Sequence, residues 1–237
     1  MKTAILTGAN GQLGKSYLKT LLDENYYVYA IDLNIVDIAC TKNIKLIQLD
    51  ITDEKEVHNF YKSINKLDVL INNAGIGVFT PFEQRTAKEF TQVMNVNLLG
   101  TFLMSQSAIV IMKKQKYGRI INIGSIYGQV SSDERIYGDS GRNNSEVYSA
   151  TKAGVIHLTK YMATHFGKYN IQTNCISPGG IFNHQSDDFV KNYVYKTPMN
   201  RMGTPDDLQM TLKFLISEDN KYINGQNITI DGGFVAW

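Results

Sequence analysis

TGANGQLG, at residues 7–14, decides how the rest of the chain is interpreted. It follows the short apolar run at residues 4–6 and precedes residues 13–22, which carry apolar side chains at helical spacing. Glycines allow a tight turn and close approach of a ligand. The helix start that follows offers free N–H groups to an anion. A glycine turn between a strand and a helix therefore predicts a dinucleotide phosphate site.

The remainder of the chain alternates apolar strand-like and helix-like segments. Strands are expected at residues 26–33, 44–50, 67–75, 118–125, 171–180 and 226–233, and long helices at residues 90–114 and 145–166. Such alternation favours a parallel sheet with helices on both faces. The length of 237 residues fits one domain. We predict an α/β fold with a doubly wound parallel sheet, a Rossmann fold, as a single domain over residues 1–237.

The composition excludes several classes of function. A net charge of +2 with scattered lysines does not call for nucleic acid or a membrane surface, and no apolar run approaches the length that spans a bilayer. The start reaches the glycine turn too soon for a secretory signal. Cys40 and Cys175 are far apart and are expected to be small buried residues, as in a cytoplasmic protein. The four histidines show no metal-ligand spacing, so no metal is expected.

The second predicted strand ends with Asp32. A carboxylate there can accept both hydroxyls of an adenosine ribose and would repel a 2′-phosphate. No arginine adjoins it, since Leu33 and Asn34 follow; Lys15 is a mild counter-signal. NAD is therefore predicted in preference to NADP.

The stretch YSATK places Tyr148 and Lys152 four residues apart, on one face of a predicted helix. That helix follows the predicted strand that ends at Ser125. The pair is surrounded by small residues, which let a ligand or a backbone come close: Ser149, Ala150, Ala153 and Gly154. The position of the pair, more than its spacing, predicts a reactive site.

At this point the chain resembles the short-chain dehydrogenase/reductase family. The resemblance rests on the glycine turn and on NNAG (72–75), NVNLLG (95–100), INIGS (121–125), YSATK (148–152), NCISPGG (174–180), RMGTPDD (201–207) and INGQNITIDGG (223–233). These motifs cover nearly the whole chain in the expected order. They imply an NAD(P)-dependent oxidoreductase that interconverts a secondary alcohol and a ketone.

The resemblance also implies roles for individual residues. Tyr148 would be the acid/base, Ser125 would hold the substrate oxygen, and Lys152 would favour the phenolate and bond the nicotinamide ribose. Asn97 would position a water that links Lys152 to solvent. Asp50 would contact the adenine, and Asn72 would line the cofactor. The full set expected to bind the cofactor is Gly8, Asn10, Gly11, Gln12, Leu13, Gly14, Asp32, Leu33, Asp50, Ile51, Asn73, Ala74, Gly75, Tyr148, Lys152, Pro178, Gly179 and Ile181.

The chain departs from the family's pattern at two places. A polar insertion at about residues 131–146 directly precedes Tyr148, and Asn183 stands where the family has threonine. A substrate loop is expected at about residues 182–204. The insertion resembles that of a bacterial subgroup labelled flagellin-modification or surface-sugar oxidoreductases, which implies a sugar-like small-molecule substrate. The insertion is expected to close over it with Asp133, Arg135, Tyr137, Asp139, Arg142, Asn143 and Asn144.

Two other functions remain open. The wide glycine spacing is commoner in sugar-nucleotide epimerases and dehydratases that retain NAD, although the short segment after DGGF favours the single-domain branch. A non-catalytic cofactor-sensing protein is the third possibility. A homo-oligomer, either a tetramer or a dimer, is expected, because the two long helices carry surplus apolar residues such as Met104, Ile109 and Met112.

Overall fold

The computed structural model describes residues 1–36, 38 and 41–237, so Cys40 lies outside the described residues. Within these, seven parallel strands form one sheet in the order β3-β2-β1-β4-β5-β6-β7. Their bounds are β1 Lys2–Thr7, β2 Tyr26–Asp32, β3 Ile44–Gln48, β4 Val69–Asn72, β5 Gly118–Ile123, β6 Ile171–Pro178 and β7 Asn227–Ile230. The direction of winding reverses between β1 and β4, which confirms the predicted doubly wound Rossmann fold.

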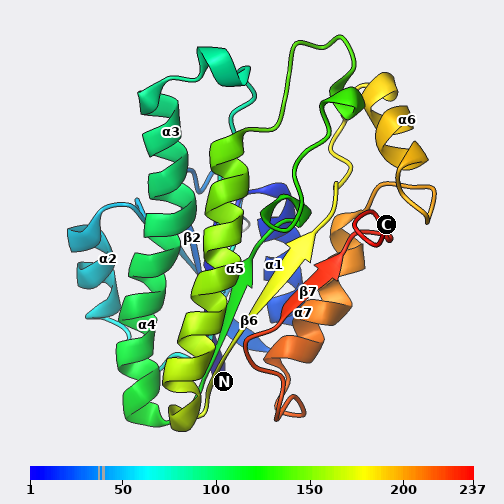
Figure 1. The fold of residues 1–237 in the computed structure, drawn as a ribbon. Coiled ribbons are helices and arrows are strands. Elements are labelled where there is room, and N and C mark those ends of the chain that lie inside the picture. The colour runs from blue at the N-terminus through cyan, green and yellow to red at the C-terminus, as the bar shows by residue number, and fades with distance from the viewer. Residues whose placement is uncertain (37, 39–40) are drawn as a thin grey trace.

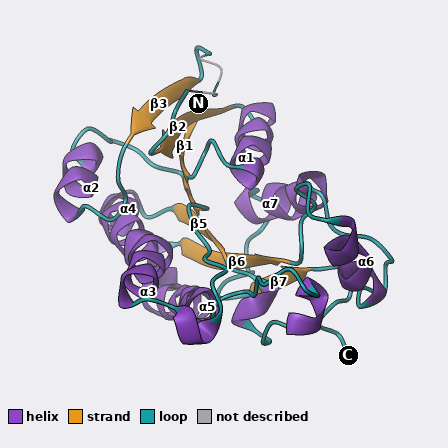
Figure 2. Cartoon of the chain, turned by 90° about the horizontal axis from the view of Figure 1, so that it is seen from above, coloured by secondary structure: helices purple, strands orange, loops and turns teal. Residues whose placement is uncertain are grey.

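Helices cover both faces of the sheet (Figure 2). One layer holds α1 (Gln12–Asp23) and α7 (Gln209–Ile216), and the other holds α2 (Glu54–Tyr61), α4 (Thr101–Gln115) and α5 (Glu146–Phe166). Two further helices, α3 (Ala87–Met94) and α6 (Asp187–Tyr195), rise beyond the tips of the strands (Figure 1). Both helices therefore stand beyond the edge of the sheet at which the strands end.

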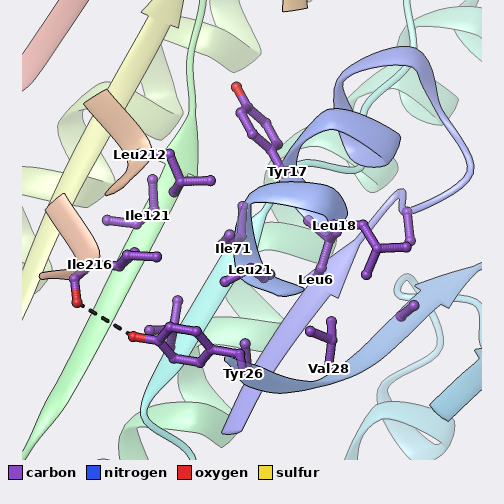
Figure 3. Packing of buried hydrophobic residues seen from close by; sticks show 14 of the residues in the cluster. Leu6, Tyr17, Leu18, Leu21, Tyr26, Val28, Ile71, Ile121, Leu212 and Ile216 are labelled. Carbon is purple, nitrogen blue, oxygen red and sulfur yellow. Dashed lines mark hydrogen bonds between the residues drawn. The ribbon is translucent and has the colours of Figure 1, made fainter. Parts of the chain in front are cut away.

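The strands bury alternate residues on opposite faces, as a sheet covered on both sides requires. In β1, Leu6 packs with Tyr17 and Leu21 of α1, whereas Ile5 joins the core under α4. Figure 3 shows the first of these cores, in which the Tyr26 hydroxyl donates to the carbonyl of Ile216. This core packs α1 and α7 on the sheet, and so it fixes the position of α1, the helix that follows the glycine turn.

The predicted helix at residues 90–114 is longer and has a break in its regularity. It begins at Ala87, after a capping box between Thr86 and Glu89, and runs to Gln115 with a π turn over Asn95–Gly100. In the described part of the chain, this helix is long and apolar enough to cross a membrane, judged by length and composition alone. In the fold, however, α4 packs on the sheet and forms part of its core.

The expectation that Met104, Ile109 and Met112 supply surplus surface was wrong. All three are buried against the sheet. The exposed apolar residues of this helix are others, namely Phe90, Leu99, Phe102 and Val110. The residue types suggested an apolar helix, but only packing reveals which side faces the sheet.

Candidate active site

A cleft of about 1080 Å³ opens above the carboxyl ends of the strands, where ligands bind in doubly wound sheets. Pockets for drug-sized ligands measure roughly 300–1,000 Å³, so this one lies at the upper end of that range and suits an extended ligand. Of the predicted site residues, it is lined by Gly8, Asn10, Gly11, Gln12, Leu13, Asp32, Leu33, Asp50, Ile51, Asn73, Ala74, Gly75, Ser125, Tyr148, Lys152, Pro178, Gly179 and Ile181. Gly14 and Asn97 are not among the lining residues.

Close backbone contacts explain two of the three glycines in the turn. Gly8 has φ +65°, and a Cβ added there would lie 2.8 Å from the Cα of Ala74. A Cβ on Gly14 would lie only 2.0 Å from the carbonyl oxygen of Gly8. Gly14 therefore lets α1 pack against the turn instead of touching a ligand. Gly11 has more room, since a Cβ added there would lie 3.4 Å from the carbonyl oxygen of Gly8, and it stands at the exposed N-cap of α1.

Side chains from neighbouring strands hold the turn in place. Asn73 Nδ2 donates to the carbonyls of Thr7 and Gly8, at 3.1 and 2.9 Å. Asp32 Oδ2 accepts from the backbone N–H of Asn10 at 2.9 Å. Because these groups bond the turn, they fix the first loop of the cleft before any ligand arrives.

The expectation that Asn72 lines the cofactor was wrong. Asn72 is the last residue of β4 and is buried, and its Nδ2 donates to Ser105 Oγ and Asn122 Oδ1 at 2.8 Å each. Successive strand residues point to opposite faces, so Asn72 turns into the helical layer while its neighbour Asn73 bonds the glycine turn. Asp50 does line the cleft, and its Oδ1 accepts from both the N–H and the hydroxyl of Thr52.

The cleft brings together Ser125, Tyr148 and Lys152. Ser125 follows β5, and its Oγ accepts from Tyr127 N at 3.1 Å. Helix α5 begins after Ser145, a buried N-cap whose Oγ accepts from Tyr148 N at 3.2 Å. This cap places Tyr148 in the first turn and Lys152 one turn further on.

Lys152 is only 5% exposed although it carries a cation. Its Nζ donates to the carbonyl of Ile123 at 2.7 Å and lies 5.6 Å from the centroid of the Tyr148 ring. Close packing of α5 on the preceding turn fixes this arrangement, since a Cβ on Gly128 would lie 2.7 Å from the carbonyl carbon of Lys152. The ammonium is thus held beside the phenol ring with little freedom to move.

Asn97 lies in the π turn, 1% exposed, behind the wall of the cleft. Its Oδ1 accepts from Ile76 N at 2.8 Å, and its Nδ2 donates to Ile76 O and to Thr151 Oγ1. A Cβ on Gly75 would lie 3.4 Å from Asn97 Oδ1 and 3.5 Å from Lys152 Nζ. The amide of Asn97 therefore ties the segment after NNAG to α5, next to the lysine. π turns are frequent at functional sites.

The insertion and the substrate loop form the other end of the cleft. From the insertion, the predicted residues Tyr137, Arg142 and Asn144 line it, as does Ser140, but Asp133, Arg135, Asp139 and Asn143 do not. From residues 182–204, the cleft is lined by Asn183, His184, Gln185, Ser186, Phe189, Tyr193 and Met202.

Several lining residues were not foreseen from the sequence. Phe79 and Gly77 follow NNAG, and Tyr127 follows Ser125. Burial raises the pKa of Tyr127, and burial raises that of Tyr193 to about 12. These phenols stay protonated at neutral pH. Tyr193 uses its oxygen to accept from Gly180 N at 2.5 Å. No local signal distinguishes Tyr193 among the fourteen tyrosines of the chain.

Comparison with known proteins agrees with this architecture. A family model described as enoyl-(acyl carrier protein) reductase matches residues 30–235. The 3-oxoacyl-(acyl carrier protein) reductase FabG of Buchnera aphidicola is 35% identical, over 98% of this chain and 96% of that protein. A short-chain dehydrogenase from Leptospira borgpetersenii, solved with bound NAD+, is 46% identical with a TM-score of 0.94, covering 98% and 92% of the two chains. ElxO, solved with NADP bound, is 29% identical with a TM-score of 0.85, covering 100% and 99%.

The chain belongs to the short-chain dehydrogenase/reductase family. The prediction of an NAD(P)-dependent oxidoreductase of this family, acting on a CH–OH group, is confirmed.

Proposed function

We propose that this enzyme uses NAD, in preference to NADP, to interconvert a secondary alcohol and a ketone in a small hydroxylated molecule. One observation carries the proposal: Ser125, Tyr148 and the buried Lys152 meet in the cleft that also contains the glycine turn. We also propose a cytoplasmic location, which the buried thiol of Cys175 supports.

The residues present fit a nicotinamide dinucleotide. Gly8 and Gly14 have no side chains, so the turn can take its tight conformation. The N-terminus of α1 faces the cleft, and its N-cap is the exposed Gly11. Asp32 would accept the adenosine ribose hydroxyls, and its charge would oppose a 2′-phosphate. Solved relatives hold NAD+ in one case and NADP in another, so the preference rests on Asp32. When bound, the nicotinamide ring supplies the hydride acceptor or donor.

The chain's own groups handle the proton. Oxidation of an alcohol releases the hydroxyl proton as well as a hydride, and Tyr148 Oη would take that proton. Lys152, held at Ile123 O beside the phenol ring, would stabilise the phenolate by its charge. Ser125 Oγ, which already accepts from Tyr127 N, would donate its own proton to the substrate oxygen and hold it in place. Asn97 would act as a positioning residue through the Ile76 segment.

For the substrate, we propose a polar, sugar-like compound in place of the acyl chain that the name FabG implies for that relative. The insertion supports this proposal, because its Ser140, Arg142 and Asn144 line the substrate end of the cleft with polar groups. These polar groups, more than the aromatic side chains beside them, favour a hydroxylated substrate over an extended acyl chain.

Replacement of Tyr148 by phenylalanine tests the assignment. Activity of Tyr148→Phe should fall by about 10²–10⁴-fold, as when a proton-transfer group is lost, while the Kd for NADH stays unchanged. Oxidation of a panel of sugars, sugar acids and sugar phosphates, followed by absorbance of the reduced nicotinamide, provides the measurement. Tyr161→Phe is the control, since Tyr161 is exposed on the same helix and does not line the cleft. Near-normal turnover by Tyr148→Phe would refute the proposal.

A further inference from the structure

The charged side chains that line the cleft fall into two groups. Asp32 and Asp50 stand at the end of the cleft with the glycine turn, and Lys152 is bonded to Ile123 O. Among the described lining residues, Lys152 and Arg142 are the lysine and the arginine. Arg142 belongs to the insertion at the opposite end of the cleft. A single cation at the substrate end points to a negatively charged group on the substrate.

Arg142 is held in position by its own surroundings. Its guanidinium carbon lies 4.2 Å from the centroid of the Phe79 ring, and the next residue, Asn143, donates its N–H to Phe79 O at 3.2 Å. Stacking on an aromatic ring orients a guanidinium while leaving its N–H donors at the edge. Phe79 and the proposed acid/base both adjoin Gly77, where an added Cβ would lie 3.8 Å from the Phe79 ring and 3.8 Å from the Tyr148 ring. Arg142 therefore stacks on a ring that adjoins the same glycine as the proposed acid/base.

Two other arginines form ion pairs with carboxylates, which neutralise their charge. Arg135 pairs with Asp133 through Nε and Nη2 at 2.9 and 2.7 Å, and Arg201 pairs with Asp207. Arg142 has no carboxylate within ion-pair distance among the described residues. The charge of Arg142 acts on a neighbouring phenol. Burial raises the pKa of Tyr137, and the positive charge of Arg142 offsets part of that rise.

We infer that Arg142 selects a substrate that carries a carboxylate or phosphate, which its guanidinium binds in bidentate fashion. This inference rests on the proposed function and narrows it to anionic hydroxy compounds. A planar guanidinium with two parallel N–H donors matches either oxyanion. The sequence offered Arg135 and Arg142 for this role, and the fold leaves Arg142 available because Asp133 occupies Arg135.

Equilibrium titrations test the inference without relying on turnover. Malonate and inorganic phosphate are titrated into the enzyme–NADH complex, with neutral dimethyl malonate as the comparison. The variants are Arg142→Gln, Arg142→Lys and the matched control Arg135→Gln, whose side chain is 84% exposed and outside the cleft. We expect Arg142→Gln to weaken anion binding by about 10–100-fold, as for the loss of charge-assisted hydrogen bonds. Arg142→Lys should retain part of the affinity, and Arg135→Gln should retain all of it.

Turnover then identifies the anion. 3-Hydroxybutyrate is compared with its methyl ester, and glucose 6-phosphate with glucose; the loss in Arg142→Gln should appear in KM for one anionic member and spare both neutral ones. Equal anion Kd in all variants, no anion binding by the wild type, or a higher kcat/KM for the neutral acetoacetyl thioester of N-acetylcysteamine would overturn the inference. Failure of the proposed function has a different signature, namely full activity of Tyr148→Phe.

Discussion

The Asp32 carboxylate bonds the backbone in addition to its proposed role in cofactor choice, and this matters for any experiment on that choice. Its Oδ2 accepts from Asn10 N in the glycine turn, and its Oδ1 accepts from Asn34 N at 3.1 Å. Removal of the whole carboxylate would therefore disturb the turn as well as the charge. The substitution to asparagine separates the two effects, because the amide oxygen still accepts from one backbone N–H.

We expect Asp32→Asn to narrow the preference for NAD over NADP by about fivefold, since the repulsion of a 2′-phosphate at a partly exposed site is worth about 1 kcal/mol. Titration of both cofactors into the wild type and the variant gives the two ratios. Asp32→Ala should weaken both cofactors further, because the turn loses its acceptor. A wild type that already prefers NADP would show that Asp32 does not set the choice.

At the scale of elements, the insertion belongs to the fold as well as to the cleft. Its 3-10 turn at Glu134–Tyr137 lies against α6 (Figure 1), and Ile136 is 1% exposed in a small core with Tyr193 and Phe234. Asn192 of α6 donates to the carbonyl of Ile136. Deletion of the insertion would uncover that core, so single substitutions are the cleaner test of its function.

Asp133 anchors the insertion in a pH-dependent manner. Hydrogen bonds from Arg135, and then from Lys196 of the segment after α6, hold the pKa of its carboxyl well below the usual range. A lowered pKa in the folded state means that the carboxylate stabilises the fold above its unfolded pKa, about 4, and that this contribution is lost as the pH falls toward the folded value.

The Tm of Asp133→Asn should therefore lie below that of the wild type at pH 7, by about 2–4 °C if the pair contributes about 1 kcal/mol. The gap should close as the pH falls below about 4. Thermal unfolding from neutral to acidic pH provides the measurement. Asp139→Asn is the control, because Asp139 is exposed in the same insertion. A gap that stays constant with pH would show that charge is not what Asp133 contributes.

Local patterns predicted most of the elements because each depends on a short stretch of chain. The glycine turn, the β5 strand before Ser125 and the α5 helix with Tyr148 all have signals of that kind. The errors have one physical origin, which is the orientation of a side chain relative to distant parts of the fold. Asn72 and Asn73 differ by one position and face different neighbours.

The fold also decides which charged residues of the insertion pair with one another. Arg135 and Arg142 stand in the same polar segment, yet within the described residues Arg135 pairs with a carboxylate and Arg142 does not. The partner of that carboxylate, Lys196, comes from the far side of α6 in the chain. Residue types therefore indicated polar recognition by the insertion, and the fold was needed to tell which arginine remains available.

At the scale of the whole molecule, the cleft has two ends built by different parts of the chain. The β1–α1 and β2 ends supply the glycine turn and Asp32, while the insertion and α6 supply the polar and aromatic wall. Ser125, Tyr148 and Lys152 stand where the two ends meet, at β5 and α5.

The outer surface of the helix at residues 87–115 leads to the last prediction. Phe90, Leu99, Phe102 and Val110 are each at least 38% exposed, although the opposite side of the same helix is buried in the core. Exposed apolar residues gathered on one element mark an association surface, and a two-fold axis would pair such a helix with its own copy. We therefore expect a dimer or tetramer that buries this surface.

Light scattering at micromolar concentration should give two or four times the chain mass of 26.7 kDa. Phe102→Glu should lower the mass, because a carboxylate would be buried without a partner in the interface. Met210→Glu should not, since Met210 is 73% exposed on α7, in the layer on the other face of the sheet. Phe102 lies just beyond the π turn that holds Asn97. Loss of the oligomer should therefore also disturb the position of Asn97 and reduce turnover. A monomeric wild type would leave these side chains without an explanation and refute the prediction.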